Sequence, residues 1–268
     1  MSQNSKAILS IIISHHGTPE LLDLCLKSIH ENINDIGHEI IIVDSESRKK
    51  TKELVREKYP EVKFIPFEKN LGYSKIVNVG LGEAKGDYIL ILNADIIVLK
   101  DAIQEMLKLM EKNSEIGILA PQLLDFTGNI QISCFNNPTM GAILARRTFF
   151  GKSKKGKKFL NEFLIKDWDR KSIRDVDWVQ GSAMMVRQTA VEKVGLFDKR
   201  FFMYFEDADW CRRFWQNNYK VVYLPNAQMA HYYHRSSKKL GGILDIIFNK
   251  YTRLHIISAL KYFKKYNA

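Results

Sequence analysis

Cysteine is scarce in this chain of 268 residues, and its placement excludes two kinds of covalent support. The three cysteines, Cys25, Cys134 and Cys211, lie far apart and form no Cys-x-x-Cys pair. A disulfide framework or a structural zinc site needs more cysteines at closer spacing. The sequence therefore predicts free thiols in a reducing compartment, and we expect a cytoplasmic protein.

Long hydrophobic runs are also missing. No window reaches about 18 uncharged apolar residues, so the sequence predicts no transmembrane helix. The stretch MSQNSKAILSIIISHHG has a short apolar run but lacks the layout of a signal peptide. Internal repeats and low-complexity linkers are absent as well, which argues against solenoid and disordered classes.

Glycine-rich phosphate loops are the third absence. The turn after the first predicted strand reads SHHGTPE and holds one glycine. A dehydrogenase fingerprint needs Gly-x-Gly-x-x-Gly at this place, because the backbone must approach a pyrophosphate closely. A P-loop is missing too. If a nucleotide binds, other groups must neutralise its phosphates.

Positive charge, by contrast, is abundant. The formal net charge is +11, which favours an anionic partner such as a phosphate, a nucleic acid or an acidic membrane surface. Solubility alone is the plainer explanation. The hydrophobic fraction of 46% is ordinary for a globular chain of this length.

The first hundred residues alternate strand and helix patterns. The apolar runs predict four strands, and capping and amphipathic patterns predict helices between them: strands 8–14, 39–44, 62–67 and 88–92, with helices from Pro19, over 48–58 and over 74–83. Strands this apolar are typical of a parallel sheet covered on both faces. We expect an α/β fold with a mainly parallel sheet.

Polar side chains follow these strands where ligands bind in such sheets, at the carboxyl ends. Singly each is explained as a turn residue, but together they favour a binding site: Ser14, His15, Asp44, Asn70, Asn93 and Asp95. A lone aspartate beside phosphates repels them unless a divalent cation bridges the two. Asp95 is therefore a candidate ligand of Mg²⁺ or Mn²⁺, with a simple turn cap as the alternative.

The second half is less regular. We expect a helix from Asp101, strands over 116–124 and around Gly181, and a strand over 221–225. Residues 126–175 show the least pattern, and GKSKKGKK (151–158) predicts a solvated loop, with a phosphate or lipid-headgroup contact as the lesser alternative.

The segment FEDADWCRR contains the sharpest catalytic candidate. In a helix over 206–216, Asp207 shares the apolar face, whereas Glu206 and Asp209 point elsewhere and Asp209 can pair with Arg213. This position favours Asp207 as a general base facing a cleft, against the alternative of an ordinary acidic first turn. Further on, His231 and His234 could ligate Mn²⁺ or be structural.

Several motifs together resemble family 2 glycosyltransferases, inverting enzymes with the Rossmann-like GT-A fold. The resemblance covers roughly residues 8–237 and rests on motifs in the family's order: IIIVDSES, NLGYSKIVNVG, LNAD, VDWVQGSAMMVR and GLFDKRFFMYFEDADWCRR. It implies a nucleotide-sugar site, an acceptor site, a metal site and a catalytic base. The resemblance implies that the nucleotide sugar is bound by Ser14, His15, Asp44, Asn70, Gly72, Asn78 and Asn93. It implies that the acceptor is bound by Trp178, Gly181 and Glu206. It further implies Asp95 and His231 as metal ligands and Asp207 as the catalytic base.

Within the family, the pattern is most similar to bacterial rhamnosyltransferases that use a deoxythymidine-diphosphate sugar. This implies sugar transfer to a hydroxyl of a glycan or lipid-linked glycan in cell-surface polysaccharide synthesis, without nucleic acid. SHHG and Asn-Ala-Asp depart from common family forms, which affects the base contacts and the metal affinity. A nucleotidyltransferase and a non-catalytic nucleotide-sugar-binding subunit stay open as alternatives.

The resemblance also sets the expected organisation. Residues 1–237 would form one catalytic domain, with a nucleotide-sugar half (1–100) and an acceptor half (101–237). Residues 238–268 would form an amphipathic helical tail. Its basic side suits an anionic membrane, here the inner face of the cell membrane. Packing on the domain, or on a second subunit in a homodimer, is the alternative.

Overall fold

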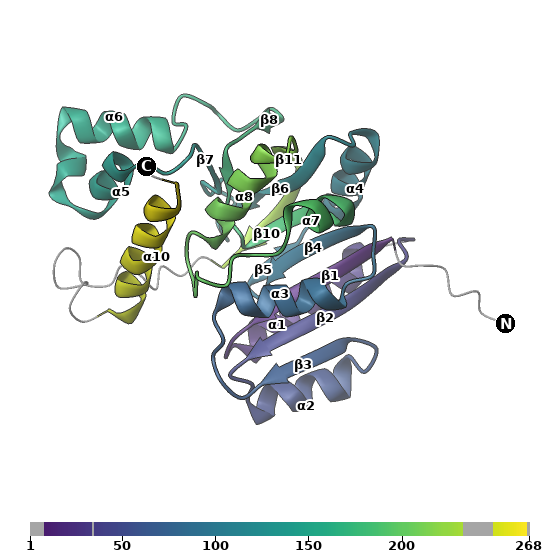
Figure 1. Cartoon of the computed structure of the whole chain (residues 1–268). Helices are drawn as coiled ribbons and strands as arrows, with labels where there is room; N and C mark the ends of the chain where they lie inside the picture. The colour runs from purple at the N-terminus through teal and green to yellow at the C-terminus, as the bar shows by residue number, and fades with distance from the viewer. Residues whose placement is uncertain (1–7, 34, 233–248, 267–268) are drawn as a thin grey trace.

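The computed structural model describes residues 8–33, 35–232 and 249–266. Its centre is a nine-stranded sheet of order β3-β2-β1-β4-β10-β6-β11-β5, with β8 beside β11 (Figure 1). The strands are β1 Leu9–His15, β2 His38–Ser45, β3 Lys63–Phe67, β4 Tyr88–Asn93, β5 Ile96–Val98, β6 Ile116–Leu124, β8 Arg174–Asp175, β10 Ala183–Arg187 and β11 Lys220–His231. β1 to β4 are parallel, as are β6 and β11, whereas β10 runs antiparallel to β4 and β6. The predicted mixed, mainly parallel sheet is confirmed.

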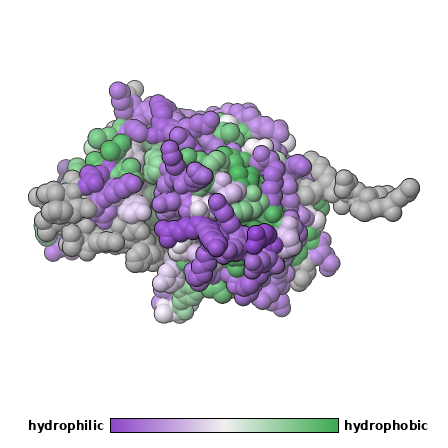
Figure 2. Space-filling view, turned by 90° about the horizontal axis from the view of Figure 1, so that it is seen from below, coloured by the Kyte–Doolittle hydropathy of each residue, from purple (hydrophilic) through white to green (hydrophobic). Residues whose placement is uncertain are grey.

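Helices cover both faces of the sheet. One face carries α1 (Pro19–Asn32), α2 (Lys49–Lys58) and α4 (Ala102–Lys112), and the other carries α3 (Tyr73–Glu83), α7 (Gln188–Val194) and α8 (Glu206–Gln216). Successive residues of a strand point to opposite faces. Because the central strands are continuous apolar runs, both faces of the sheet are apolar. Viewed from the β3 and α2 side, the outer surface is mostly hydrophilic (Figure 2).

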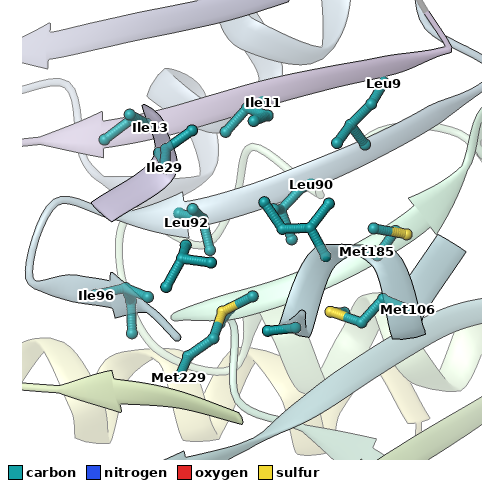
Figure 3. Packing of buried hydrophobic residues seen from close by; sticks show 14 of the residues in the cluster. Leu9, Ile11, Ile13, Ile29, Leu90, Leu92, Ile96, Met106, Met185 and Met229 are labelled. Atoms are coloured by element: carbon teal, nitrogen blue, oxygen red, sulfur yellow. The ribbon is translucent and has the colours of Figure 1, made fainter. Parts of the chain in front are cut away.

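The core divides into two layers along this alternation. Ile11 of β1 packs with Leu90 and Met185 against the first set of helices, where Met106 of α4 closes the layer (Figure 3). Ile12, the next residue of β1, packs into the second layer with α3 and α8. Continuous apolar strands are what a sheet buried on both sides requires.

Two predictions for the second half are wrong. Residues 151–158 do not form a loop: they end a 3₁₀ turn, η1 (Phe149–Lys152), and begin α6 (Lys154–Phe163). Ser153 caps α6 by accepting the Gly156 N–H at 3.0 Å. The region also holds β7 (Cys134–Phe135) and α5 (Met140–Arg147).

Gly181 was expected within a strand, but it lies in the turn between β9 (Trp178–Val179) and β10. Its N–H donates to the Asp207 carboxylate at 2.9 Å instead of joining a strand ladder. A side chain from α8 thus satisfies the backbone N–H of this turn.

Of the predicted helical tail (238–268), residues 238–248 and 267–268 lie outside the described residues, and the described part forms α10 (Lys250–Tyr266), which packs on the domain. Tyr262 is fully buried, and its ring lies 5.4 Å from that of Phe205. Ser258 Oγ donates to the Met203 carbonyl at 2.8 Å. Packing on the domain is thus the alternative that the structure supports for this helix. In the described part of the chain, no helix has the length and apolarity needed to cross a membrane.

Candidate functional site

The carboxyl ends of β1, β2 and β4 bring four predicted residues together. The strand register places Ser14 opposite Asn93 and His15 opposite Asp44. Ser14 Oγ donates to Asn93 Oδ1 at 2.9 Å. Polar groups from three strands therefore meet at one edge of the sheet, as the sequence predicted.

His15 and Asp44 form a fully buried pair. The Thr18 N–H donates to His15 Nε2 at 3.1 Å, so the ring proton lies on Nδ1 and is donated to Asp44 Oδ1 at 2.7 Å. The other oxygen, Asp44 Oδ2, is buried and has no hydrogen-bond partner among the described residues. It is an acceptor for an N–H or O–H group of a ligand.

The loop before α3 joins this edge to the second half of the chain. Asn70 is exposed, and its Oδ1 accepts the Gly72 N–H at 3.0 Å. Gly72 has φ +80°, and a Cβ there would lie 2.4 Å from the Phe202 carbonyl oxygen. Only glycine therefore allows this close approach. Asn78 lies apart from the edge: its amide donates to Phe197 O and accepts the Phe197 N–H, both at 2.9 Å, which gives it a structural role.

Asp95 and His231 converge from distant parts of the chain, as expected. Asp95 lies in the β4–β5 turn and His231 ends β11, and Asp95 Oδ1 is 3.7 Å from His231 Nε2. Gln131 donates its amide N–H groups to two carbonyls, so its Oε1 accepts a hydrogen bond from His231 Nδ1–H at 3.0 Å. The lone pair of His231 therefore lies on Nε2, toward Asp95.

This arrangement fits a divalent cation. Asp95 Oδ1 is buried without a hydrogen-bond partner among the described residues, and burial raises the pKa of Asp95 to about 6. Burial lowers the pKa of His231 to about 4, which keeps the ring neutral. Two bonds of about 2.1 Å can span the 3.7 Å separation. Within the described ranges no third histidine, cysteine or carboxylate joins them, so substrate oxygens would complete the coordination.

Asp207, the predicted catalytic base, is held by backbone groups of two segments. Its Oδ2 accepts the Gly181 N–H at 2.9 Å and its Oδ1 accepts the Ala208 N–H at 2.8 Å. Burial raises the pKa of Asp207, whereas these two donors and the Trp178 indole lower it. Each oxygen keeps a second lone pair, so the group can still accept a proton.

The prediction that Glu206 and Asp209 point away from the interior is wrong. Both are buried, with 5% and 0% of their surface exposed. Burial and the charge of Asp207 raise the pKa of Glu206 well above its ordinary value, and Glu206 Oε2 has no partner among the described residues. Asp209 pairs with Arg213 at 2.9 Å, as predicted, but also accepts hydrogen bonds from Lys265 and Tyr266 of α10. The helix-face pattern failed because α10 covers the other side of α8.

Two residues of the site were missed by sequence reasoning. The Tyr73 hydroxyl donates to the Gly181 carbonyl, and the charges of Glu206, Asp207 and Asp95 add to burial in raising its pKa. One phenol thus lies within electrostatic reach of all three carboxyls. A Cβ at Gly181 would lie 3.3 Å from the Tyr73 hydroxyl, so Gly181 makes room for this contact. Gln131, the partner of His231, has no signal in the sequence at all.

Comparison with known proteins identifies what this chain is similar to. The model of the family described as "Glycosyl transferase family 2" matches residues 10–178. A curated relative from Mycobacterium tuberculosis, N-acetylglucosaminyl-diphospho-decaprenol L-rhamnosyltransferase, is 29% identical over 72% of this chain and 66% of its own length. Rhamnosyltransferase WbbL of Escherichia coli is 25% identical over 94% of this chain and 91% of its own.

Solved structures show the same fold at lower sequence identity. GalNAc-T7, crystallised with UDP, GalNAc and Mn²⁺, matches 88% of this chain and 46% of its own, with a TM-score of 0.63 and 16% identity. A mannosyltransferase from Pyrobaculum calidifontis, in complex with GDP-Man and Mn²⁺, covers 89% of this chain and 59% of its own at a TM-score of 0.56 and 16% identity. The predicted GT-A fold is confirmed.

Proposed function

The chain belongs to glycosyl transferase family 2, and from this premise we propose that it moves a sugar from a nucleoside-diphosphate sugar to a hydroxyl group of a glycan or lipid-linked glycan, with inversion. One observation carries the proposal. Asp95 has a buried oxygen without a hydrogen-bond partner among the described residues and faces His231 Nε2 at 3.7 Å, whereas Asp207 accepts backbone N–H groups on both oxygens, which suits a metal ligand and a proton acceptor respectively.

On the donor side, we assign the nucleoside to the strand ends and the diphosphate to the turn after β4. Asp44 Oδ2 would accept a hydrogen bond from the nucleoside, and the hydrogen bond from His15 would hold the Asp44 carboxylate in place. Ser14 and Asn93 would lie beside the nucleoside. Asp95 and His231 would hold Mg²⁺ or Mn²⁺, which supplies positive charge opposite the leaving diphosphate.

On the acceptor side, we assign Asp207 as the general base. Its carboxylate takes the proton of the acceptor hydroxyl while that oxygen bonds to the anomeric carbon. The bond from this carbon to the diphosphate oxygen breaks, the electron pair leaves with the diphosphate, and the configuration inverts. Glu206, protonated because its pKa is raised, would donate a hydrogen bond to the acceptor.

The finer assignment is a rhamnosyltransferase that uses dTDP-rhamnose. Its support is the pair of rhamnosyltransferase relatives, one of which is named for a diphosphate-linked lipid acceptor. Metal dependence rests on the Asp95–His231 geometry and on the Mn²⁺ named with both solved neighbours.

A panel of sugar nucleotides tests the function. With Mn²⁺ present, dTDP-rhamnose at 100 times its Kd should stabilise the protein by about 2.7 kcal/mol, whereas UDP- and GDP-sugars should shift its Tm less. Transfer to an N-acetylglucosaminyl-diphospho-lipid should then release dTDP. Release of pyrophosphate would instead indicate a nucleotidyltransferase, and binding without turnover would indicate a non-catalytic subunit.

A further inference from the structure

Charge is distributed very unevenly along the chain. Residues 126–161 contain no aspartate or glutamate but seven basic residues: Arg146, Arg147, Lys152, Lys154, Lys155, Lys157 and Lys158. This segment therefore supplies seven of the eleven net positive charges. All five of its lysines are exposed.

Large apolar side chains are exposed among these cations. Phe149 is 82% exposed, Leu144 is 50% exposed and Met140 is 43% exposed. The Lys152 ammonium lies 5.3 Å from the centre of the Phe149 ring. Exposed aromatic and aliphatic groups beside lysines are typical of surfaces that enter the headgroup region of a bilayer. A nucleic acid would bind the lysines through its phosphates, but contact with the exposed aliphatic groups would add little to its affinity.

The helices of this segment pack closely against each other. We call residues 140–163, which form α5, η1 and α6, the basic arm. A Cβ at Gly156 would lie 2.0 Å from the Phe150 carbonyl oxygen, and one at Gly151 would lie 2.2 Å from that of Ala145. The two glycines therefore permit close packing of the helices, and Phe149 is displayed from a fixed turn between them.

The basic arm adjoins the acceptor side of the site. The Trp178 ring lies 4.6 Å from that of Phe135, 5.8 Å from that of Phe163 in α6 and 6.4 Å from that of Phe205, the residue before α8, which carries Asp207. In Figure 1, α5 and α6 lie together at the end of the molecule far from β3 and α2.

We propose that the basic arm docks on an anionic lipid bilayer, with Phe149 and Leu144 entering the headgroup region and the lysines contacting lipid phosphates. The benefit of this placement rests on the proposed function, since it would bring a lipid-linked acceptor to the Asp207 side. Binding itself needs no activity. The surface differs from the tail helix that the sequence offered as a membrane-binding candidate, because α10 is packed on the domain.

Vesicle sedimentation of the full chain tests the proposal. We expect binding to vesicles of phosphatidylcholine with 30% phosphatidylglycerol and little binding to phosphatidylcholine alone. Salt should release the protein as its concentration rises through about 0.1 M, where exposed charges are screened over ~10 Å. K154Q/K155Q/K157Q/K158Q should weaken binding by about 10²–10³-fold, because each lysine at such a surface contributes roughly tenfold or less. F149A should weaken it by about tenfold.

A matched control comes from α2. K49Q/K50Q/K52Q/K58Q removes the same charge from the far end of the molecule and should leave binding within about threefold of wild type, since the arm is intact. Unchanged Tm values should accompany the arm variants, because the replaced side chains are exposed. Equal losses in the two quadruple variants, no binding by wild type, or equal binding to both vesicle types would overturn the proposal. The proposal would also be overturned if duplex RNA displaced the vesicles from the protein and F149A bound vesicles as well as wild type does. Sugar transfer to a water-soluble acceptor, measured separately, tests the proposed function without the bilayer.

Discussion

Asp95 is partly exposed and Asp207 is buried, and the chain surrounds these two carboxyls in opposite ways. Asp95 has one oxygen without a partner among the described residues and faces the neutral Nε2 of His231 at 3.7 Å. Asp207 has backbone N–H donors on both oxygens. Asp95 has an oxygen that can take up an added positive charge, whereas the two N–H donors on Asp207 offset part of the rise in pKa that burial causes. Under the proposed function, the donor side would depend on an added cation, and the acceptor side would depend on the backbone groups that hold Asp207.

The largest expected effect is at the acceptor side. Asp207→Asn should lower sugar transfer by about 10²–10⁴-fold, because the amide cannot take a proton. Donor affinity should change little, since the proposed donor contacts lie on β1, β2 and β4. Glu206→Gln is the comparison: a protonated carboxyl resembles an amide, so it should cost much less. A dead Glu206→Gln with an active Asp207→Asn would reverse the assignment. Single-turnover rates at saturating donor measure both.

The donor side should respond next. Asp95→Ala should lower the rate of sugar transfer by ~10²-fold or more, because losing the metal would remove several kcal/mol of charge stabilisation from the transition state. His231→Ala should do the same less severely. Titration of Mn²⁺ with a nucleoside diphosphate, followed by Tm, separates binding from catalysis. Unaltered Mn²⁺ dependence in both variants would remove the metal from this pair.

The tail helix offers a stability test. Lys265 donates to Asp209, which is fully buried, and to Asp198 at 2.9 Å. Lys265→Met should reduce the free energy of unfolding by about 2–3 kcal/mol, because it removes a partner from a buried charge. The exposed neighbour Lys264 provides the control, and Lys264→Met should be close to neutral. Equal urea midpoints for the two variants would mean that α10 does not support α8 through this ion pair.

A pH effect should follow from His255 of α10. Burial and the charges of Arg147 and Arg146 lower the pKa of His255 to about 3, whereas the unfolded ring titrates near 6.5. The unfolded state therefore binds more protons between these values, and stability is lost as pH falls from about 6.5 toward 3. Between pH 7 and 4.5, wild type should lose about 2 kcal/mol more than His255→Phe, which keeps the ring contacts with Tyr204 and Phe205. Parallel stability curves for the two proteins would contradict this.

The smallest expected effect concerns the residue that orients His231. Gln131→Leu removes the acceptor of the Nδ1 proton and should weaken Mn²⁺ binding by about tenfold. Gln131→Glu keeps an acceptor and should restore most of the affinity. Isothermal titration with Mn²⁺ distinguishes the two variants, and identical affinities would show that the tautomer of His231 does not matter.

The donor side could be predicted because its information is local. Ser14, Asp44 and Asn93 each follow an apolar strand, and parallel strands bring their carboxyl ends to one edge. Asp95 was predicted from the same strand-end pattern, the family motifs paired it with His231, and the structure places the two 3.7 Å apart. Asn78 was predicted by motif alone, and its bonds to Phe197 could not be read from the sequence.

The sequence by itself determined the alternation of strands and helices, the placement of polar groups after the strands and the family, since each depends on neighbours within one element or on ordered motifs. Only the tertiary structure decided the surroundings of α8. Asp209 is buried by α10, about fifty residues later, and His231 is oriented by Gln131, about one hundred residues earlier. Burial of a charge depends on every element packed around it, and a pattern along one helix describes only that helix's own faces.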